Sequence, residues 1–119
     1  MEYNEKLEWL KSYRGLHDKF TYLNNRIKNV KTASYGDDMS AGIPKTINDL
    51  IDDKNKVLEQ MEDIENTIDD MENQTYSSLL AYRFLLFYSL EETGEKMAYS
   101  YQWTVKQQKK AIESLKIGA

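Results

Sequence analysis

Residues 9–30 read WLKSYRGLHDKFTYLNNRIKNV, and an apolar side chain returns at every third or fourth position of this stretch. Residues 47–71 read INDLIDDKNKVLEQMEDIENTIDDM and repeat the spacing, with Lys54 as the one polar member. Steps of three and four keep one stripe of a helix facing a partner helix, as in a coiled coil. The two stripes consist of Trp9, Tyr13, Leu16, Phe20, Leu23, Ile27 and Val30, and of Ile47, Leu50, Lys54, Val57, Met61, Ile64, Ile68 and Met71. The pattern therefore predicts two long paired helices.

We expect the first helix to span residues 3–31 and the second residues 45–72, joined by residues 32–43. This connection reads TASYGDDMSAGI, and its Gly, Asp and Ser residues favour turns. The stripes span about 32 and 36 Å at 1.5 Å per residue, so their lengths suit an antiparallel hairpin. Residues 1–34 carry seven basic against four acidic side chains, whereas residues 44–72 carry three against ten, and this opposition favours pairing.

Two local signals mark the start of the second helix. Pro44 suits a helix start, where its missing N–H matters least. Thr46 and Asp49 have the spacing of a capping box, with Asp in place of the usual Glu.

The character of the chain changes after residues 73–75, where Asn, Gln and Thr predict a break. Apolar side chains crowd residues 79–90, and a helix that is apolar on most sides is expected to be buried on most sides. A short helix over residues 90–97, a turn at residues 98–100 and a last helix over residues 101–116 complete the prediction. Short helices with a tight turn before the last are typical of a helix-turn-helix.

The predicted fold is therefore all-α, with two parts. Residues 1–73 form a long antiparallel helical hairpin of the coiled-coil type, and residues 74–119 form a small three-helix bundle of the helix-turn-helix type.

Composition and missing motifs exclude several function classes. The chain has 119 residues, a net charge of −4 and no Cys, so we expect no disulfide and no thiolate metal site. The N-terminus is unlike a signal peptide, and residues 79–90 are too short for a membrane span. We expect a soluble, cytoplasmic protein.

We expect no enzymatic activity, no metal, no cofactor and no small-molecule substrate. The sequence contains no GxxxxGK[ST], GxGxxG or GxSxG motif. His17 is the only His and has no ligand partner at fixed spacing, so we interpret it as a surface residue. The acidic run in residues 63–72 lacks the Gly-containing loop of a calcium site and is interpreted as a solvated helix face.

The last helix carries the most informative polar pattern. From residue 95 onward the chain has five Lys against two Glu. Lys106, Lys109 and Lys110 recur at helical spacing beside Ser100 and Gln102, together with further Thr and Gln side chains. Such residues contact phosphates and base edges when a helix enters the major groove, although a solvated terminal helix has the same pattern.

Residues 83–115 read RFLLFYSLEETGEKMAYSYQWTVKQQKKAIESL. This run resembles the C-terminal part of a family of small phage and prophage regulators that are similar to sigma-factor region 4, the ArpU/RinA-like proteins. The matching elements are Arg83-Phe84-Leu85, Leu90-Glu91-Glu92, Met97-Ala98-Tyr99-Ser100 and Lys110-Ala111-Ile112. The resemblance implies a helix-turn-helix that binds DNA, preceded in some members by a coiled coil.

The chain departs from the family pattern at five positions. Thr93, Gly94 and Ala98 stand where the family places an apolar residue, Ala and the turn Gly; Thr104 and Gln107 replace buried Val and Leu. Polar side chains buried without partners cost about 1–3 kcal/mol each, and a Gly inside a helix weakens it. The helix-turn-helix is therefore expected to be eroded, and either to repack around Tyr99, Trp103 and Leu115 or to have lost DNA docking.

Two functions from different classes follow. The first is a phage-type transcriptional regulator that binds duplex DNA. Its candidate residues are Ser100, Gln102, Trp103 and Lys106 at the start of the recognition helix, with Lys109 and Lys110 on phosphates.

The second is a phage-encoded interaction module that inhibits a host or defence protein, as an anti-CRISPR protein does, by acidic mimicry of nucleic acid. Its candidate residues are Asp63, Glu65, Asp69 and Asp70. The excess of Tyr and Trp supplies interface anchors for this reading. A structural or scaffold role is a third alternative. In each case we expect a homodimer, because a two-helix hairpin leaves apolar surface that a second copy can cover.

Overall fold

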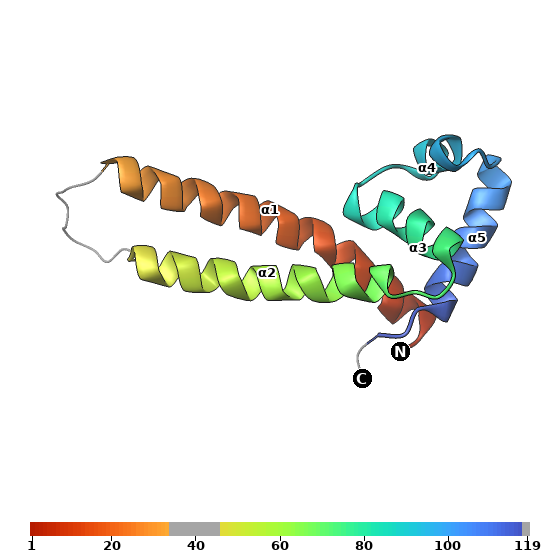
Figure 1. Ribbon diagram of the computed structural model, residues 1–119, viewed down its shortest axis with the longest axis horizontal. Helices are drawn as coiled ribbons and strands as arrows, with labels where there is room; N and C mark the ends of the chain where they lie inside the picture. The colour runs from red at the N-terminus through yellow and green to blue at the C-terminus, as the bar shows by residue number, and fades with distance from the viewer. Residues whose placement is uncertain (34–45, 118–119) are drawn as a thin grey trace. The chain divides into compact units, whose positions relative to one another are not determined.

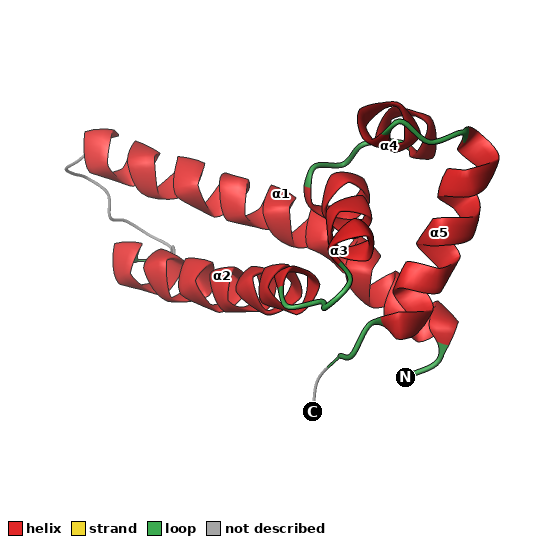
Figure 2. Cartoon of the chain, turned by 45° about the vertical axis from the view of Figure 1, so that its right-hand side comes forward, coloured by secondary structure: helices red, strands yellow, loops and turns green. Residues whose placement is uncertain are grey.

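The computed structural model describes residues 1–33 and 46–117, and these residues form helices without a strand (Figures 1 and 2). The elements are α1 (Tyr3–Ala33), α2 (Ile47–Asp69), α3 (Gln74–Leu80), the π-helical turn η1 (Ala81–Leu85), α4 (Leu90–Met97) and α5 (Tyr101–Ser114). The all-α prediction is confirmed for the described residues. No helix among them combines the length and apolar character needed to cross a membrane.

The helix ends agree with the sequence patterns in most places. The predicted capping box at the start of α2 is confirmed: the Asp49 N–H donates to Thr46 Oγ1 at 3.1 Å, and the Thr46 N–H donates to Asp49 Oδ2 at 3.4 Å. α4 has the predicted bounds. Residues 34–45 lie outside the described residues, and they include Pro44 and most of the connection predicted at residues 32–43.

Two helices end earlier than predicted. α2 stops at Asp69 instead of residue 72, and its last turn holds no basic side chain. Acidic side chains at a helix C-terminus oppose the macrodipole, and Asn73 caps α3 by accepting hydrogen bonds from the next N–H groups. α5 stops at Ser114 instead of residue 116, because the extended backbone of Leu115 ends the helix.

The described contacts divide the chain into two compact units, and the boundaries differ from the expected one at residue 73. Unit 1 contains Met1–Gly15 and Glu62–Ala119, and unit 2 contains Leu16–Met61. The first turns of α1 and the last turns of α2 thus belong with the short C-terminal helices. Sequence periodicity gives no sign of this division, because both stripes run on without interruption.

Unit 2 is a two-helix hairpin in which α1 and α2 run in opposite directions, orange against yellow and green in Figure 1. Its core consists of the predicted stripe residues Leu23, Ile27, Leu50, Val57 and Met61, all buried. The ammonium of Lys54, the polar stripe residue, lies 5.8 Å from the ring centroid of Phe20. A cation over an aromatic face is attracted by the ring quadrupole, so Lys54 remains compatible with the apolar seam.

Unit 1 surrounds a core contributed by α1, α2, α3, η1 and α5. Its buried apolar residues are Leu10, Tyr13, Ile64, Ile68, Leu79, Leu80, Phe84, Ala111, Ile112 and Leu115. Leu10 is fully buried although it lies outside the predicted stripe, while Trp9, the predicted member, is half-buried. The Ser77 hydroxyl donates to the Ile68 carbonyl at 2.8 Å and joins α3 to α2.

The apolar segment 79–90 is buried less completely than predicted. Leu79, Leu80 and Phe84 are buried, but Leu86 is 54% exposed. The reason is that α3 does not continue: it widens into η1, and the backbone then turns at Phe87, whose φ is 64°. A bulky residue at positive φ is strained, and π-helical turns are rare, so tertiary contacts must hold this segment.

Candidate functional site

The segment from α4 to α5 has the connectivity of a helix-turn-helix (Figure 2). Ser89 begins α4 with a complete capping box, in which its hydroxyl accepts from the Glu92 N–H and the Glu92 carboxylate accepts from the Ser89 N–H. Ala98 then adopts the left-handed conformation, and the Tyr99 N–H donates to the Gly94 carbonyl at 2.8 Å. This arrangement closes the last turn of α4 and directs the chain into α5.

α5 is anchored by one side of the helix. Thr104, Gln107, Ala111 and Ile112 are buried, and α5 packs against both α3 and α4. The fit to α4 depends on Gly94, because a Cβ there would lie 2.8 Å from Thr104 Oγ1 and 3.0 Å from the Tyr99 carbonyl oxygen.

Further polar contacts hold the middle and the C-terminal end of α5. Arg83 of η1 donates from Nε to Gln108 Oε1 at 2.7 Å and from Nη1 to the Tyr88 carbonyl at 2.9 Å. Burial lowers the pKa of Arg83 below its ordinary value. At the C-terminal end of α5, Lys6 Nζ of α1 donates to the Glu113 carbonyl at 2.8 Å. A cation there also complements the negative end of the helix dipole.

Two of the five departures that suggested erosion, Thr104 and Gly94, have structural explanations. The Thr104 hydroxyl donates to the Ser100 carbonyl at 2.8 Å, and Gly94 permits the close approach of two helices rather than merely weakening one. Gln107 is buried, and its side chain is not among the unpaired buried groups. Within the described residues, Thr93 Oγ1 is the buried side-chain polar atom that has no hydrogen-bond partner. Leu115 is buried as the repacking expectation requires, but Trp103 remains largely exposed.

All six residues proposed for DNA contact lie at the exposed side of α5 or at its start. They are Ser100, Gln102, Trp103, Lys106, Lys109 and Lys110. Ser100 also has a structural role, because its hydroxyl accepts a hydrogen bond from the Trp103 N–H at 3.1 Å and caps α5. Among the residues that the structure describes, none forms an ion pair with the three lysines. Their charges are thus available to an anionic ligand.

Four exposed residues of α5, namely Tyr101, Val105, Glu113 and Ser114, were missing from the candidate set. Tyr101 and Val105 lie on one flank of the lysine face, and Glu113 lies at its C-terminal end. Projection at 3.6 residues per turn places Val105 and Glu113 outside the buried stripe, so their exposure was signalled in the sequence. Tyr101 projects about 20° from the buried Ile112, so the projection did not signal its exposure at the first position of the helix.

The four acidic candidates do not share one surface. Asp63 and Asp70, seven positions apart, line a groove of about 850 Å³ together with Glu72, Tyr76 and Lys116. Asp69 is exposed outside the groove, and Glu65 is half-buried and accepts a hydrogen bond from the Tyr13 phenol. Helical spacing explains this separation. Asp63 and Asp70 are seven positions apart and share a face of α2, whereas Asp63 and Glu65 are two positions apart and do not.

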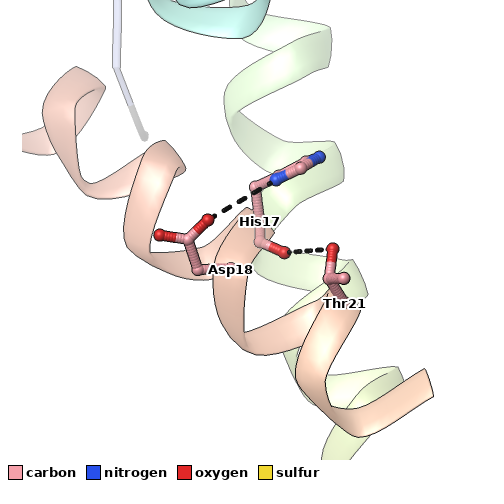
Figure 3. Close-up of polar contacts among 3 residues, drawn as sticks. All are labelled: His17, Asp18 and Thr21. Carbon is pink, nitrogen blue, oxygen red and sulfur yellow. Dashed lines mark hydrogen bonds and ion pairs between the residues drawn. The ribbon is translucent and has the colours of Figure 1, made fainter. Parts of the chain in front are cut away.

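His17 and Asp18 are neighbours on α1, and Figure 3 marks the contact between the His17 ring and the Asp18 carboxylate. His17 Nδ1 is 3.8 Å from Asp18 Oδ1, a contact that becomes an ion pair when the imidazole is protonated, and the His17 carbonyl accepts from Thr21 Oγ1 at 3.0 Å. The described part of the chain contains no group of three His, Asp or Glu side chains arranged to hold a metal ion.

Comparison of the chain with known protein families, with curated proteins and with solved structures found no match.

Proposed function

We propose that the chain is a DNA-binding regulator of the phage type, which contacts duplex DNA through the exposed side of α5. The observation that supports this proposal best is the lysine triplet Lys106, Lys109 and Lys110, which forms no ion pair with the described residues and lies on a helix that follows a tight turn. Lysine ammoniums bind phosphates, while Gln102 and the hydroxyl of Ser100 are suited to base edges or sugar–phosphate oxygens. The resemblance of residues 83–115 to phage regulators points to the same ligand.

Salt dependence of duplex binding tests this proposal. Neutralisation of three phosphates gives a slope of roughly −2.7 in log K against log salt, which is about 40-fold weaker binding from about 50 to 200 mM salt. Fluorescence anisotropy with a labelled duplex measures it. Binding that stays flat with salt, or that is absent at low salt, contradicts the proposal.

A matched pair of charge variants distinguishes the contribution of the α5 face to DNA binding from the contribution of net charge. Replacement of Lys106, Lys109 and Lys110 by Gln should reduce both the affinity and the salt slope. Replacement of three exposed lysines elsewhere, Lys11, Lys19 and Lys56, changes the net charge equally and should leave both nearly unchanged.

A second candidate function is inhibition of a protein partner through the acidic groove beside Asp63 and Asp70. The groove favours this function, since three carboxylates and the phenol of Tyr76 line one concave surface. Immobilised protein should retain a stoichiometric partner from bacterial lysate, and charge reversal by Asp63→Lys with Asp70→Lys should release it. The matched reversal of Asp52 and Glu59, both exposed, should not. Failure to retain any such partner contradicts this candidate.

The homodimer stays a prediction for either function. A dimeric regulator places two recognition helices on adjacent half-sites, about one DNA turn apart. Light scattering coupled to gel filtration gives the mass of the chain alone and with duplex; a monomer in both conditions contradicts the prediction.

A further inference from the structure

The first turn of α5 exposes an unusual amount of aromatic surface. Tyr101 is 51% exposed and Trp103 is 48% exposed. The Trp103 ring makes an edge contact with Tyr99, with ring centroids 6.4 Å apart and an interplanar angle of 77°. This contact restricts the orientation of the indole and leaves nearly half of its surface free to contact a ligand.

Two cations follow Trp103 on the same side of the helix. Residues three and seven positions further on, Lys106 and Lys110, share its face, and Lys110 lies about 10 Å along the axis at 1.5 Å per residue. We call Trp103, Lys106 and Lys110 the α5 strip. An aromatic plane followed by ammonium groups is the combination that proteins use for unpaired nucleotides, where a base stacks and the backbone contacts the cations.

The surface of α4 favours a ligand that contacts α5 alone. Its exposed side carries three acidic residues, Glu91, Glu92 and Glu95, and one basic residue, Lys96, so it is acidic on balance. A regular duplex that lies across both helices would bring phosphates near these carboxylates, and like charges repel. A nucleotide displaced from the stack can reach the α5 strip without that approach.

We propose that the α5 strip binds an unpaired base in DNA, with the Trp103 indole stacked on the base and Lys106 and Lys110 on the adjacent phosphates. The inference rests on the proposed DNA binding and makes it more specific. It predicts preference for DNA that contains a bulged or extrahelical nucleotide over fully paired DNA of the same sequence. Stacking on one aromatic side chain corresponds to roughly tenfold in affinity.

The test compares two labelled duplexes of about two helical turns, identical except for one central unpaired thymine in one of them. Anisotropy should show about tenfold tighter binding of the bulged duplex by the wild-type protein. Trp103→Leu should remove this preference, so that the two duplexes bind with equal affinity, whereas Trp103→Phe, which keeps a ring, should retain part of it. Tyr22→Leu removes another exposed aromatic side chain, which is 57% exposed on α1, and should change neither affinity.

Fluorescence gives a second readout that does not depend on Trp103 variants. The chain contains two Trp residues, so a Trp9→Phe background reports on Trp103 alone. Stacking should quench its emission with the bulged duplex more than with the paired one. Equal affinities without quenching overturn the inference and leave the proposed function intact, whereas no binding of either duplex at low salt overturns both.

Discussion

The phenol of Tyr13 in α1 donates a hydrogen bond to Glu65 Oε2 in α2. The Tyr13 ring also lies 6.0 Å from the Phe87 ring, and the guanidinium of Arg14 lies 4.6 Å from the Phe87 ring centroid. Phe87 is the residue held at a φ of 64° between η1 and α4. One buried tyrosine thus contacts both α2 and the strained loop that leads into the candidate DNA-binding helices.

Tyr13→Phe should destabilise unit 1 by about 1–2 kcal/mol, because the ring stays and the charge-assisted hydrogen bond is lost. Urea unfolding followed by circular dichroism measures the change. Tyr22→Phe removes the same hydroxyl from an exposed position on α1 and should change the free energy of unfolding by less than about 0.5 kcal/mol. Equal stability of Tyr13→Phe and wild type would show that the bond to Glu65 contributes nothing.

Stability should also depend on Tyr13 at alkaline pH. Burial, the hydrogen bond to Glu65 and the charge of that carboxylate all raise the pKa of Tyr13 above its ordinary value. The folded state therefore retains a proton that the unfolded state loses above about pH 10. The stabilising contribution is complete below this pH and falls by up to about 1.4 kcal/mol per pH unit above it.

Unfolding free energies measured from about pH 8 to 11 should therefore decline more steeply for wild type than for Tyr13→Phe. The difference between the two proteins cancels the titration of the other tyrosines and of the lysines. Parallel pH profiles would contradict the assignment.

Replacement of Gly94 and of Gly15 by Ala should change the stability of the protein in opposite directions, although both residues lie inside helices. At Gly94 the new Cβ would lie 2.8 Å from Thr104 Oγ1 and 3.0 Å from the backbone oxygen of Tyr99, so α4 and α5 must separate. We expect Gly94→Ala to destabilise by about 1–3 kcal/mol despite the better helix propensity of Ala. At Gly15 nothing lies within 4 Å, so Gly15→Ala should stabilise by up to about 1 kcal/mol. Thermal unfolding of both variants measures the contrast, which would be refuted by changes of the same sign.

Local sequence patterns are enough to predict the helices, but they do not show which segments pack against each helix. Thr46, Ser89, Glu92 and Ser100 are capping residues that act within three positions, so the starts of α2, α4 and α5 were predictable within two residues. The two apolar stripes likewise contain all the buried apolar residues that the structure describes in unit 2.

Contacts between distant segments account for what the sequence did not predict. Leu10 is buried because segments from the other end of the chain belong to the same unit as the start of α1. Phe87 likewise contacts the ring of Tyr13, and Gly94 lies close to Thr104, and no local pattern identifies these pairs of residues as neighbours. The six DNA candidates are exposed as expected, whereas the acidic set was chosen without regard to helical phase and separates into two faces.

Thr93→Val should stabilise the protein by about 1 kcal/mol. Thr93 is fully buried and its hydroxyl has no partner, so a methyl of nearly the same size removes a desolvation cost without leaving a cavity. Thr104→Val is the matched control on the adjoining helix: Thr104 is equally buried, but its hydroxyl is bonded to the Ser100 carbonyl. Chemical denaturation should show a gain for Thr93→Val and no gain for Thr104→Val; a loss at Thr93 would mean that its hydroxyl is paired in solution.

Ala98→Gly should also be stabilising, because this residue turns the chain between α4 and α5 with φ 62° and ψ 41°. A Cβ disfavours this left-handed conformation by about 1 kcal/mol, and Gly adopts it freely. The expected gain is therefore about 0.5–1 kcal/mol in urea unfolding. Ala81→Gly tests the opposite case, since Ala81 has helical dihedral angles of −63° and −46°, and Gly there should destabilise by a similar amount.

If the α5 face binds DNA through a correctly formed turn, Ala98→Gly should leave duplex affinity equal to that of wild type or higher. A weaker affinity together with a higher stability would indicate that binding requires the turn to change its conformation.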